Sequence, residues 1–186
     1  MTNPASRERL VQLLRERSFE RKRVVLASGR ESDFFIDCKQ TILTAEGHAL
    51  VGELMFDALP PCEAVAGVEL GGCPLASAVS LVSFQRGRPL PAFYVRKEVK
   101  DHGSRKLVEG DRALHPGIQV VILEDVITTG GSTLKAVDKL RTAGAQVVGV
   151  VALVDRLEGG VEAIQRDGGL PVVSICSRRD FLPDSG

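Results

Sequence analysis

The chain has 186 residues, a length typical of one domain that buries roughly 70% of its unfolded surface. Its 24 basic and 24 acidic residues cancel, which argues against a general binder of nucleic acids or membrane surfaces. No apolar run approaches the ~20 residues of a transmembrane helix, and the first residues do not resemble a signal peptide. The four cysteines form no C-x-x-C pair. We therefore expect a cytoplasmic protein with reduced thiols.

The first 43 residues are expected to form a helix and a hairpin outside the main sheet. Pro4 follows an Asn, which suits a helix that starts there and continues to about Arg17. The stretch VVLASGRESDFFIDCK alternates around a Ser-Gly turn, as a β-hairpin does.

From residue 44 onward, the predicted helices and strands alternate. The expected helices begin near Thr44, Pro74, Ser132 and after residue 156, and the expected strands span 64–69, 91–97, 119–125, 145–156 and 171–176. This alternation implies an α/β fold, an open and mostly parallel sheet with helices on both faces. We therefore predict one domain over residues 1–186, with its α/β core in residues 44–186.

Residues 96–117 interrupt the alternation. They carry many charges and three glycines without clear periodicity. We predict one long mobile loop here, because loops of this length inside compact domains are usually functional or disordered.

The segment EDVITTGGST, residues 124–133, joins a buried strand to a helix and carries the strongest functional signal. Its glycines let backbone N–H groups close around an anion, and its hydroxyls add donors. Glu124 and Asp125 would repel a phosphate, but adjacent carboxylates can accept hydrogen bonds from the vicinal hydroxyls of a ribose. A ribose 5-phosphate satisfies both halves of the segment. The alternative is an acid-capped turn without a ligand.

Three other groups of residues have both a functional and a plain reading. The segment YVRKEVKDHG, residues 94–103, supplies cations that can stabilise a leaving group, although solvated charged loops are common. Phe34 and Phe35 lie in the predicted hairpin, where strand alternation assigns one of them to core packing. Arg156 ends a predicted strand, where a structural ion pair is the alternative to a ligand contact.

These motifs resemble those of the orotate phosphoribosyltransferases. EDVITTGGST is similar to the family's signature for 5-phospho-α-D-ribosyl 1-diphosphate (PRPP), RKEVKDHG to its basic loop, and SGRESDFF to the hood that covers the pyrimidine. The resemblance implies a glycosyltransferase that moves the phosphoribosyl group of PRPP to orotate, giving orotidine 5′-monophosphate (OMP) and pyrophosphate, in the de novo synthesis of UMP. It also implies a homodimer whose mobile loop reaches the neighbouring site, and Mg²⁺ held mainly through PRPP and water.

The resemblance assigns site residues by position. The catalytic set comprises Lys100, His102, Glu124 and Asp125. The PRPP-binding set comprises Arg96, Lys97, Lys100, His102, Glu124, Asp125, Val126, Ile127, Thr128, Thr129, Gly130, Gly131, Ser132 and Thr133, together with Glu69, Leu70, Gly71 and Gly72. The orotate-binding set comprises Phe34, Phe35, Thr128 and Arg156, whose guanidinium suits the carboxylate of orotate.

Four positions depart from the family pattern. Ala27 and Gly71 stand where some members have lysines, Leu70 stands where some have a Tyr, and Glu124 replaces the commoner Asp. These changes bear on affinity more than on identity. Two other functions remain open at this point: a phosphoribosyltransferase for another nucleobase, and a non-catalytic regulator of the same fold that binds PRPP or nucleotides.

Overall fold

The computed structural model describes residues 4–25, 31–98 and 106–182. The chain starts with helix α1 (Pro4–Arg17), the antiparallel strands β1 (Phe19–Val25) and β2 (Glu31–Ile36), and the one-turn helix α2 (Lys39–Ile42). The first helix and the hairpin confirm the sequence expectation, whereas the turn of the hairpin lies outside the described residues. Helix α2 was not predicted, because a single turn is too short to show a helical period.

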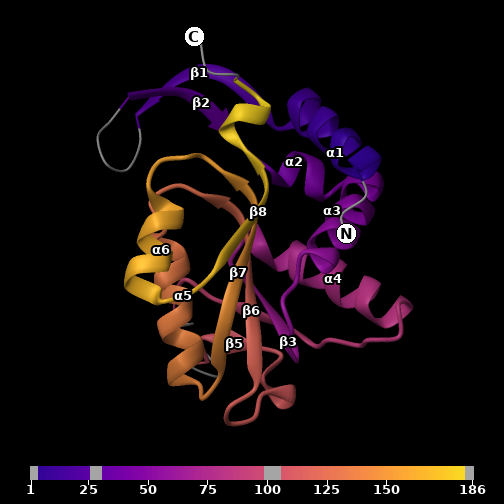
Figure 1. Cartoon of the computed structure of the whole chain (residues 1–186), viewed down its shortest axis with the longest axis vertical. Helices are drawn as coiled ribbons and strands as arrows, with labels where there is room; N and C mark the ends of the chain where they lie inside the picture. The colour runs from indigo at the N-terminus through magenta and orange to yellow at the C-terminus, as the bar shows by residue number, and fades with distance from the viewer. Residues whose placement is uncertain (1–3, 26–30, 99–105, 183–186) are drawn as a thin grey trace.

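The rest of the chain forms a six-stranded sheet with helices between its strands (Figure 1). The strands are β3 (Ala64–Val68), β4 (Ala92–Val95), β5 (Val108–Glu109), β6 (Gln119–Ile127), β7 (Gln146–Asp155) and β8 (Val172–Ser177). The helices are α3 (Ala45–Asp57), α4 (Gly72–Gln85), α5 (Gly131–Thr142) and α6 (Gly160–Gly168), with 3₁₀ turns η1 (Asp111–Ala113) and η2 (Arg178–Asp180). Only β5 is antiparallel to its neighbour, so the predicted fold class is confirmed. Within the described residues, no helix is long and apolar enough to span a membrane.

Each face of the sheet has its own hydrophobic core. Figure 1 shows α1, α3 and α4 on one side of the sheet and α5 and α6 on the other. Along β6, Val121 and Leu123 pack in the first core, whereas Val120 and Ile122 pack in the second. Val126 packs in the first core and Ile127 in the second, so the strict alternation ends at the two acids between Leu123 and Val126.

In the strand order β5-β4-β3-β6-β7-β8, the parallel neighbours β3 and β6 are a switch point: the strand that follows each one in the chain is added on the opposite side of the pair. The chain leaves β3 through α4 toward β4, and it leaves β6 through α5 toward β7 on the other side. In open parallel sheets, ligands bind beyond the carboxyl ends of the strands at such a switch point. The fold therefore places a candidate site where β3 and β6 end.

The stretch 96–117 is more structured than the single loop that we expected. Within it, β5 pairs with β4 through Tyr94 and Glu109, and η1 follows directly. The ammonium of Lys106 bonds the Asp111 carboxylate. A two-residue strand leaves no periodic signal in a sequence, which explains why it was missed. Residues 99–105 lie outside the described part of the chain.

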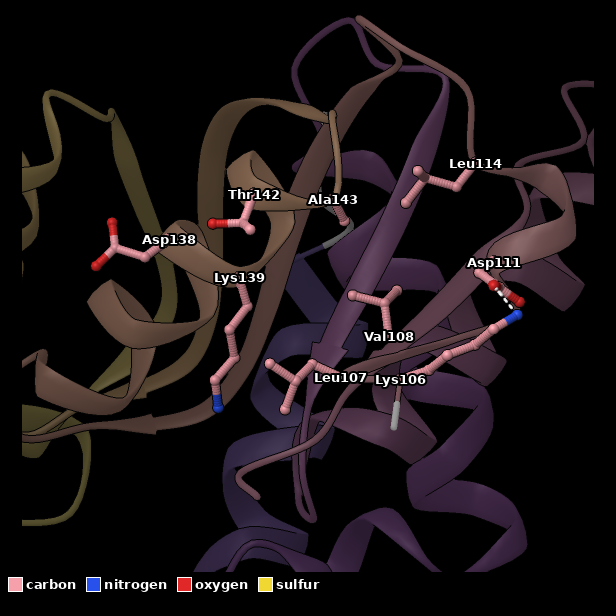
Figure 2. Close-up of a pocket in the computed structure, with 9 residues that line it drawn as sticks. All are labelled: Lys106, Leu107, Val108, Asp111, Leu114, Asp138, Lys139, Thr142 and Ala143. Atoms are coloured by element: carbon pink, nitrogen blue, oxygen red, sulfur yellow. Dashed lines mark hydrogen bonds and ion pairs between the residues drawn. The ribbon is translucent and has the colours of Figure 1, made fainter. Parts of the chain in front are cut away.

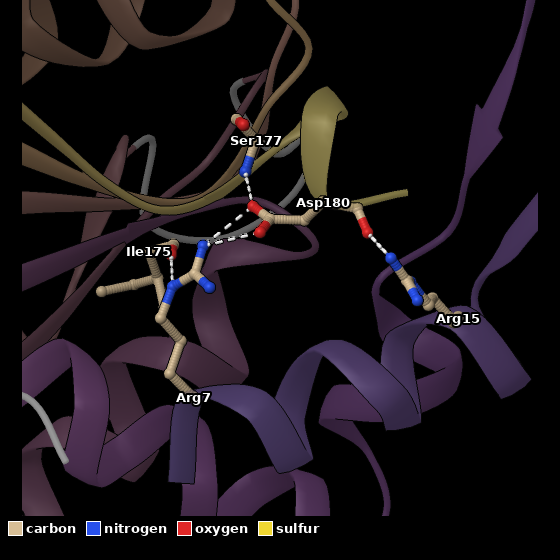
Figure 3. A network of polar contacts seen from close by, with 5 residues as sticks. All are labelled: Arg7, Arg15, Ile175, Ser177 and Asp180. Atoms are coloured by element: carbon tan, nitrogen blue, oxygen red, sulfur yellow. Dashed lines mark hydrogen bonds and ion pairs between the residues drawn. The ribbon is translucent and has the colours of Figure 1, made fainter. Parts of the chain in front are cut away.

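The N-terminal helix is fastened to the end of β8 by a network of polar contacts (Figure 3). Arg7 donates from Nη2 to both carboxylate oxygens of Asp180, at 2.8 and 2.9 Å, and from Nε to the Ile175 carbonyl at 2.9 Å. Asp180 also accepts a bond from the Ser177 backbone N–H at 2.8 Å, and Arg15 Nε donates to its carbonyl at 2.9 Å. This clamp holds α1, and the hairpin that follows it, against the sheet.

Candidate active site

The predicted acid pair lies at the end of β6, where the two carboxyls are close enough to hydrogen-bond each other although each also contacts a different neighbouring segment. Glu124 follows Ile122 toward α5, where its Oε2 accepts hydrogen bonds from Thr133 Oγ1 at 2.9 Å and Ser132 Oγ at 3.4 Å. Its side chain is only 4% exposed. Burial, and then the neighbouring negative charge of Asp125, raise the pKa of Glu124 to about 8. Burial therefore favours the protonated form of this carboxyl in the ligand-free protein.

Asp125 lies against the loop that follows β3. Its Oδ1 accepts a bond from the Val126 backbone N–H at 2.9 Å, and a Cβ on Gly71 would lie 1.8 Å from its Oδ2. Burial raises the pKa of Asp125, while bonds from the backbone and the charge of Lys39 oppose the rise. A side chain at position 71 would therefore require the Asp125 carboxylate to move.

The predicted phosphate loop closes over the N-terminus of α5. Gly130 has φ +81°, the left-handed region that favours glycine, and a Cβ there would lie 2.8 Å from the Gly160 carbonyl oxygen of α6. The first backbone bond of the helix runs from Leu134 N to Gly130 O at 2.9 Å. The N–H groups of residues 131–133 therefore face out of the helix end, where the helix dipole favours an anion.

Two members of the predicted PRPP set belong to the strand more than to the loop. Ile127 is 1% exposed and packs in the core on the α5 side, and its carbonyl accepts a bond from Arg156 N at 3.0 Å. Val126 is partly buried against the other core. Their side chains pack against protein, and the hydroxyl-bearing residues that follow form the open part of the segment.

The segment 69–72 forms a cradle beyond β3. Glu69 donates its backbone N–H to the Val95 carbonyl at 2.9 Å, and its Oε2 accepts the Lys97 backbone N–H at 2.8 Å. The peptide between Glu69 and Leu70 is cis, and the Leu70 side chain is 64% exposed. A Cβ on Gly72 would lie 2.5 Å from the Leu123 carbonyl, so the cradle backbone lies tightly against β6.

Of the cations predicted beyond β4, the structure describes Arg96 and Lys97, which directly follow the strand. Arg96 bonds Glu109 at 3.0 Å through Nη1, and the charge of Lys97 lowers the pKa of Glu124. A cavity of about 320 Å³ opens between these residues and the first turns of α5, and its lining includes Val95, Arg96, Lys97 and Ser132. The cavity brings the predicted leaving-group cations and the phosphate loop to one space. Lys100, His102 and Ala27 lie outside the described residues.

The hairpin meets the end of β7 through Arg156. Its Nη2 donates to the Phe34 carbonyl at 2.9 Å and forms an ion pair with Glu158 at 3.0 Å. The Phe34 ring has no exposed surface and packs against Phe19, with ring centroids 5.2 Å apart. The Phe35 ring points to the other face of the hairpin, where it is half-buried and the Lys22 ammonium lies 3.8 Å from its centroid.

Sequence reasoning missed three charged residues next to the site. Glu158 pairs with Arg156, and its position two residues later was a usable signal. Lys39 bonds Asp37 at 2.6 Å and lowers the pKa of Asp125, and the sequence DCK gave only a weak hint of it. Lys139, on the third turn of α5, contacts the chain beyond β4, and no sequence signal pointed there. Among the residues that the structure describes, no three His, Cys, Asp or Glu side chains are grouped so as to hold a metal ion.

Comparison with known proteins agrees with this geometry. A family model described as phosphoribosyl transferase domain matches residues 52–168. Orotate phosphoribosyltransferase of Sorangium cellulosum is 83% identical over 184 residues, covering 97% of this chain and 95% of the relative. The Bradyrhizobium sp. (strain ORS 278) enzyme of the same name is 45% identical, covering 98% and 100%. A crystal structure of Mycobacterium tuberculosis orotate phosphoribosyltransferase in complex with PRPP has 36% identity and TM-score 0.77, covering 95% of this chain and 98% of that one.

Proposed function

The chain belongs to the orotate phosphoribosyltransferase family, and we infer that the site between β3 and β6 carries out that family's reaction. The enzyme transfers the phosphoribosyl group of PRPP to orotate in pyrimidine biosynthesis, releasing pyrophosphate and OMP. The structural observation that supports this inference most is the segment 124–133, in which two acids lie next to a helix N-terminus that can bind an anion. The family predicted from the sequence is thereby confirmed.

We propose that the site has two sides with different tasks. The ribose-phosphate side, residues 124–133, binds the sugar hydroxyls with Glu124 and Asp125 and the 5-phosphate with the hydroxyls and N–H groups of Thr128 to Thr133. The pyrophosphate side, residues 69–72 with Arg96 and Lys97, receives the leaving group, and we assign Lys100 and His102 to the same task. Its cations oppose the negative charge that grows as the bond to pyrophosphate breaks.

The two carboxylates have a second proposed task in the transition state. As pyrophosphate leaves, positive charge develops on the ribose ring, and a carboxylate fixed beside the ring stabilises that charge. The Lys97 ammonium favours the ionised form of Glu124, since it lowers the pKa of that group. We therefore expect Glu124 to lose its proton when PRPP binds, whereas burial keeps the proton on the free protein.

Orotate is proposed to bind between the hairpin and the end of β7. Arg156 is held in one orientation by the Phe34 carbonyl and by Glu158, which suits a guanidinium that must meet a carboxylate in a fixed plane. Phe35 and Thr128 are the proposed contacts to the ring. Phe34 is proposed to act through its carbonyl, because its ring lies in the core.

Mg²⁺ fits this site as a partner of the substrate. Carboxylates and phosphate oxygens are ligands that Mg²⁺ prefers, and in phosphoryl sites it keeps several waters and binds one or two carboxylates. Glu124 and Asp125 already accept hydrogen bonds within the protein. We propose that the diphosphate of PRPP and water supply most ligands, and that the ion neutralises charge on the diphosphate. All four cysteines are free thiols, which supports the proposed cytoplasmic location.

A homodimer is proposed, with α4 at its interface. Leu81 and Phe84 lie one turn apart on α4, and their side chains are 55% and 73% exposed, so they offer an apolar face to a second copy. In such a dimer the basic segment of one subunit is proposed to serve the other subunit's site. Mixing Lys100→Ala with Asp125→Asn subunits then restores activity, because one site of the mixed dimer has neither defect. Mixed dimers as inactive as both parents contradict the arrangement.

The reaction itself is tested by the loss of orotate absorbance in the presence of PRPP and Mg²⁺. We expect turnover of orotate and none of adenine, hypoxanthine or uracil. Folded protein that ignores orotate and accepts one of the other bases refutes the substrate. Folded protein that binds PRPP and converts no base identifies a regulator instead.

A further inference from the structure

The main chain on either side of Lys97 is held by two charged side chains from distant segments. Lys139 donates from Nζ to the carbonyl oxygens of Arg96 and Lys97, at 2.8 and 2.7 Å. From the other side, Glu69 Oε2 accepts the Lys97 backbone N–H at 2.8 Å. These bonds lie directly beyond Val95, the last residue of β4, where the backbone pairing toward β5 ends with the Arg96 N–H bonding the Leu107 carbonyl at 2.9 Å.

Lys139 reaches this place across the face of α5. Figure 2 shows its side chain extended along a cavity of about 420 Å³, with the ammonium at the far end. The cavity wall is apolar at Leu107, Val108 and Leu114. The Lys139 stem lines the same cavity, and its ammonium bonds the carbonyls of residues 96 and 97.

A plain explanation for a cation in the last turns of a helix is that it bonds carbonyls at the helix end. Lys139 lies in the last turn of α5, together with Arg141. Arg141 donates to the Gly168 carbonyl at the end of α6, near the helix termini. Lys139 instead bonds two carbonyls just beyond β4, which are 43 and 42 residues earlier in the chain. Helix-end stabilisation therefore does not account for its contacts.

We propose that Lys139 is a positioning residue for the pyrophosphate side. By fixing two consecutive carbonyls, it sets the main chain from which the Arg96 and Lys97 side chains extend toward the cavity that they share with Ser132. One helix then organises both sides of the site, with the phosphate loop at its start and the Lys139 ammonium at its third turn. This inference rests on the proposed function, because it assigns the pyrophosphate of PRPP to these cations.

The test compares two ligands that share the ribose-phosphate side. PRPP carries a pyrophosphate and OMP does not, so a fault confined to the pyrophosphate side weakens PRPP alone. Lys139→Met keeps most of the stem and removes the ammonium, and Lys139→Arg keeps a donor for the carbonyls. Lys135→Met, one turn earlier on α5, removes the same charge from the lining of the same cavity, but it leaves the bonds from Lys139 to the carbonyls of residues 96 and 97 in place. Dissociation constants for PRPP with Mg²⁺, and for OMP, are measured by calorimetry.

In Lys139→Met we expect the dissociation constant for PRPP to rise about tenfold, the magnitude typical of losing hydrogen bonds to a charged group, while that for OMP stays within about twofold. Lys139→Arg should recover most of the loss, and Lys135→Met should weaken PRPP by less than about threefold. The proposal is overturned if Lys139→Met weakens PRPP and OMP equally, or if it leaves the dissociation constant for PRPP unchanged. It is also overturned if Lys139→Met and Lys135→Met weaken PRPP to the same extent. A wild-type protein that binds neither ligand refutes the proposed function instead.

Discussion

The proposed ribose-phosphate side, residues 124–133, is one continuous segment, whereas the proposed pyrophosphate side is assembled from segments 69–72 and 96–97, and Lys139 holds the second of these. On the first side, both acids lie near the end of one strand, and the next helix supplies the donors to Glu124. On the second side, Lys97 depends on Glu69 and on Lys139, which are 28 and 42 residues away. The first side can therefore be recognised in the sequence as a motif, whereas the residues of the second side come together only when the chain folds.

The largest expected effect is on the acids of the ribose-phosphate side. Asp125→Asn and Glu124→Gln preserve shape and remove charge, so we expect kcat to fall by about 100-fold or more, as for other preorganised electrostatic groups. Steady-state rates with saturating orotate and PRPP measure this, and circular dichroism verifies that the variants fold. Wild-type turnover in both variants would refute the assignment of the two sides.

The same division explains which parts of the fold and site the sequence could predict. Local signals worked: Thr44 caps α3 by accepting from Gly47 N at 3.1 Å, and the segment 124–133 joins a buried strand to a helix N-terminus as predicted. Alternation in the hairpin showed that one of Phe34 and Phe35 is buried but not which, because register depends on tertiary packing. The bond of Arg7 to Asp180 spans 173 residues, and no local pattern encodes such a contact.

The buried carboxyl of Glu124 also makes stability depend on pH. Its pKa is raised from 4.5 to about 8 in the folded protein, so the folded state keeps a proton that the unfolded state loses. Between these two pH values the free energy of unfolding must fall as pH rises, by up to about 1.4 kcal/mol per pH unit for this group. Below pH 4.5 the contribution is fully present, and above pH 8 it is lost.

Glu124→Gln removes this titration and sharpens the contrast with the pyrophosphate side. Urea unfolding of the ligand-free protein at several pH values measures the slope, with Arg7→Met, far from the site, as a control that retains the carboxyl and its charged neighbours. We expect the variant to lose less stability than the wild type as pH rises toward 8. Parallel pH profiles for the two proteins would show that Glu124 is already ionised at neutral pH.

The smallest expected effect belongs to the clamp at the N-terminal helix, which touches neither side of the site. Arg7→Met removes a two-pronged bond to a partly exposed Asp180, so we expect a loss of about 1 kcal/mol of stability. Thermal unfolding measures it, and the dissociation constants for PRPP and OMP should not move. A change in either constant would mean that the clamp acts on the site and that the two sides are not independent of it.

The central claim, a site with two separable sides, is tested most directly by measuring OMP and inorganic pyrophosphate binding to Asp125→Asn and Lys97→Met. The account predicts a crossover: Asp125→Asn weakens OMP and spares pyrophosphate, whereas Lys97→Met weakens pyrophosphate and spares OMP, each loss being about tenfold for a charged hydrogen-bond partner. Substitutions that weaken both ligands to the same extent would contradict it, because the acids and the cations would then serve one undivided site.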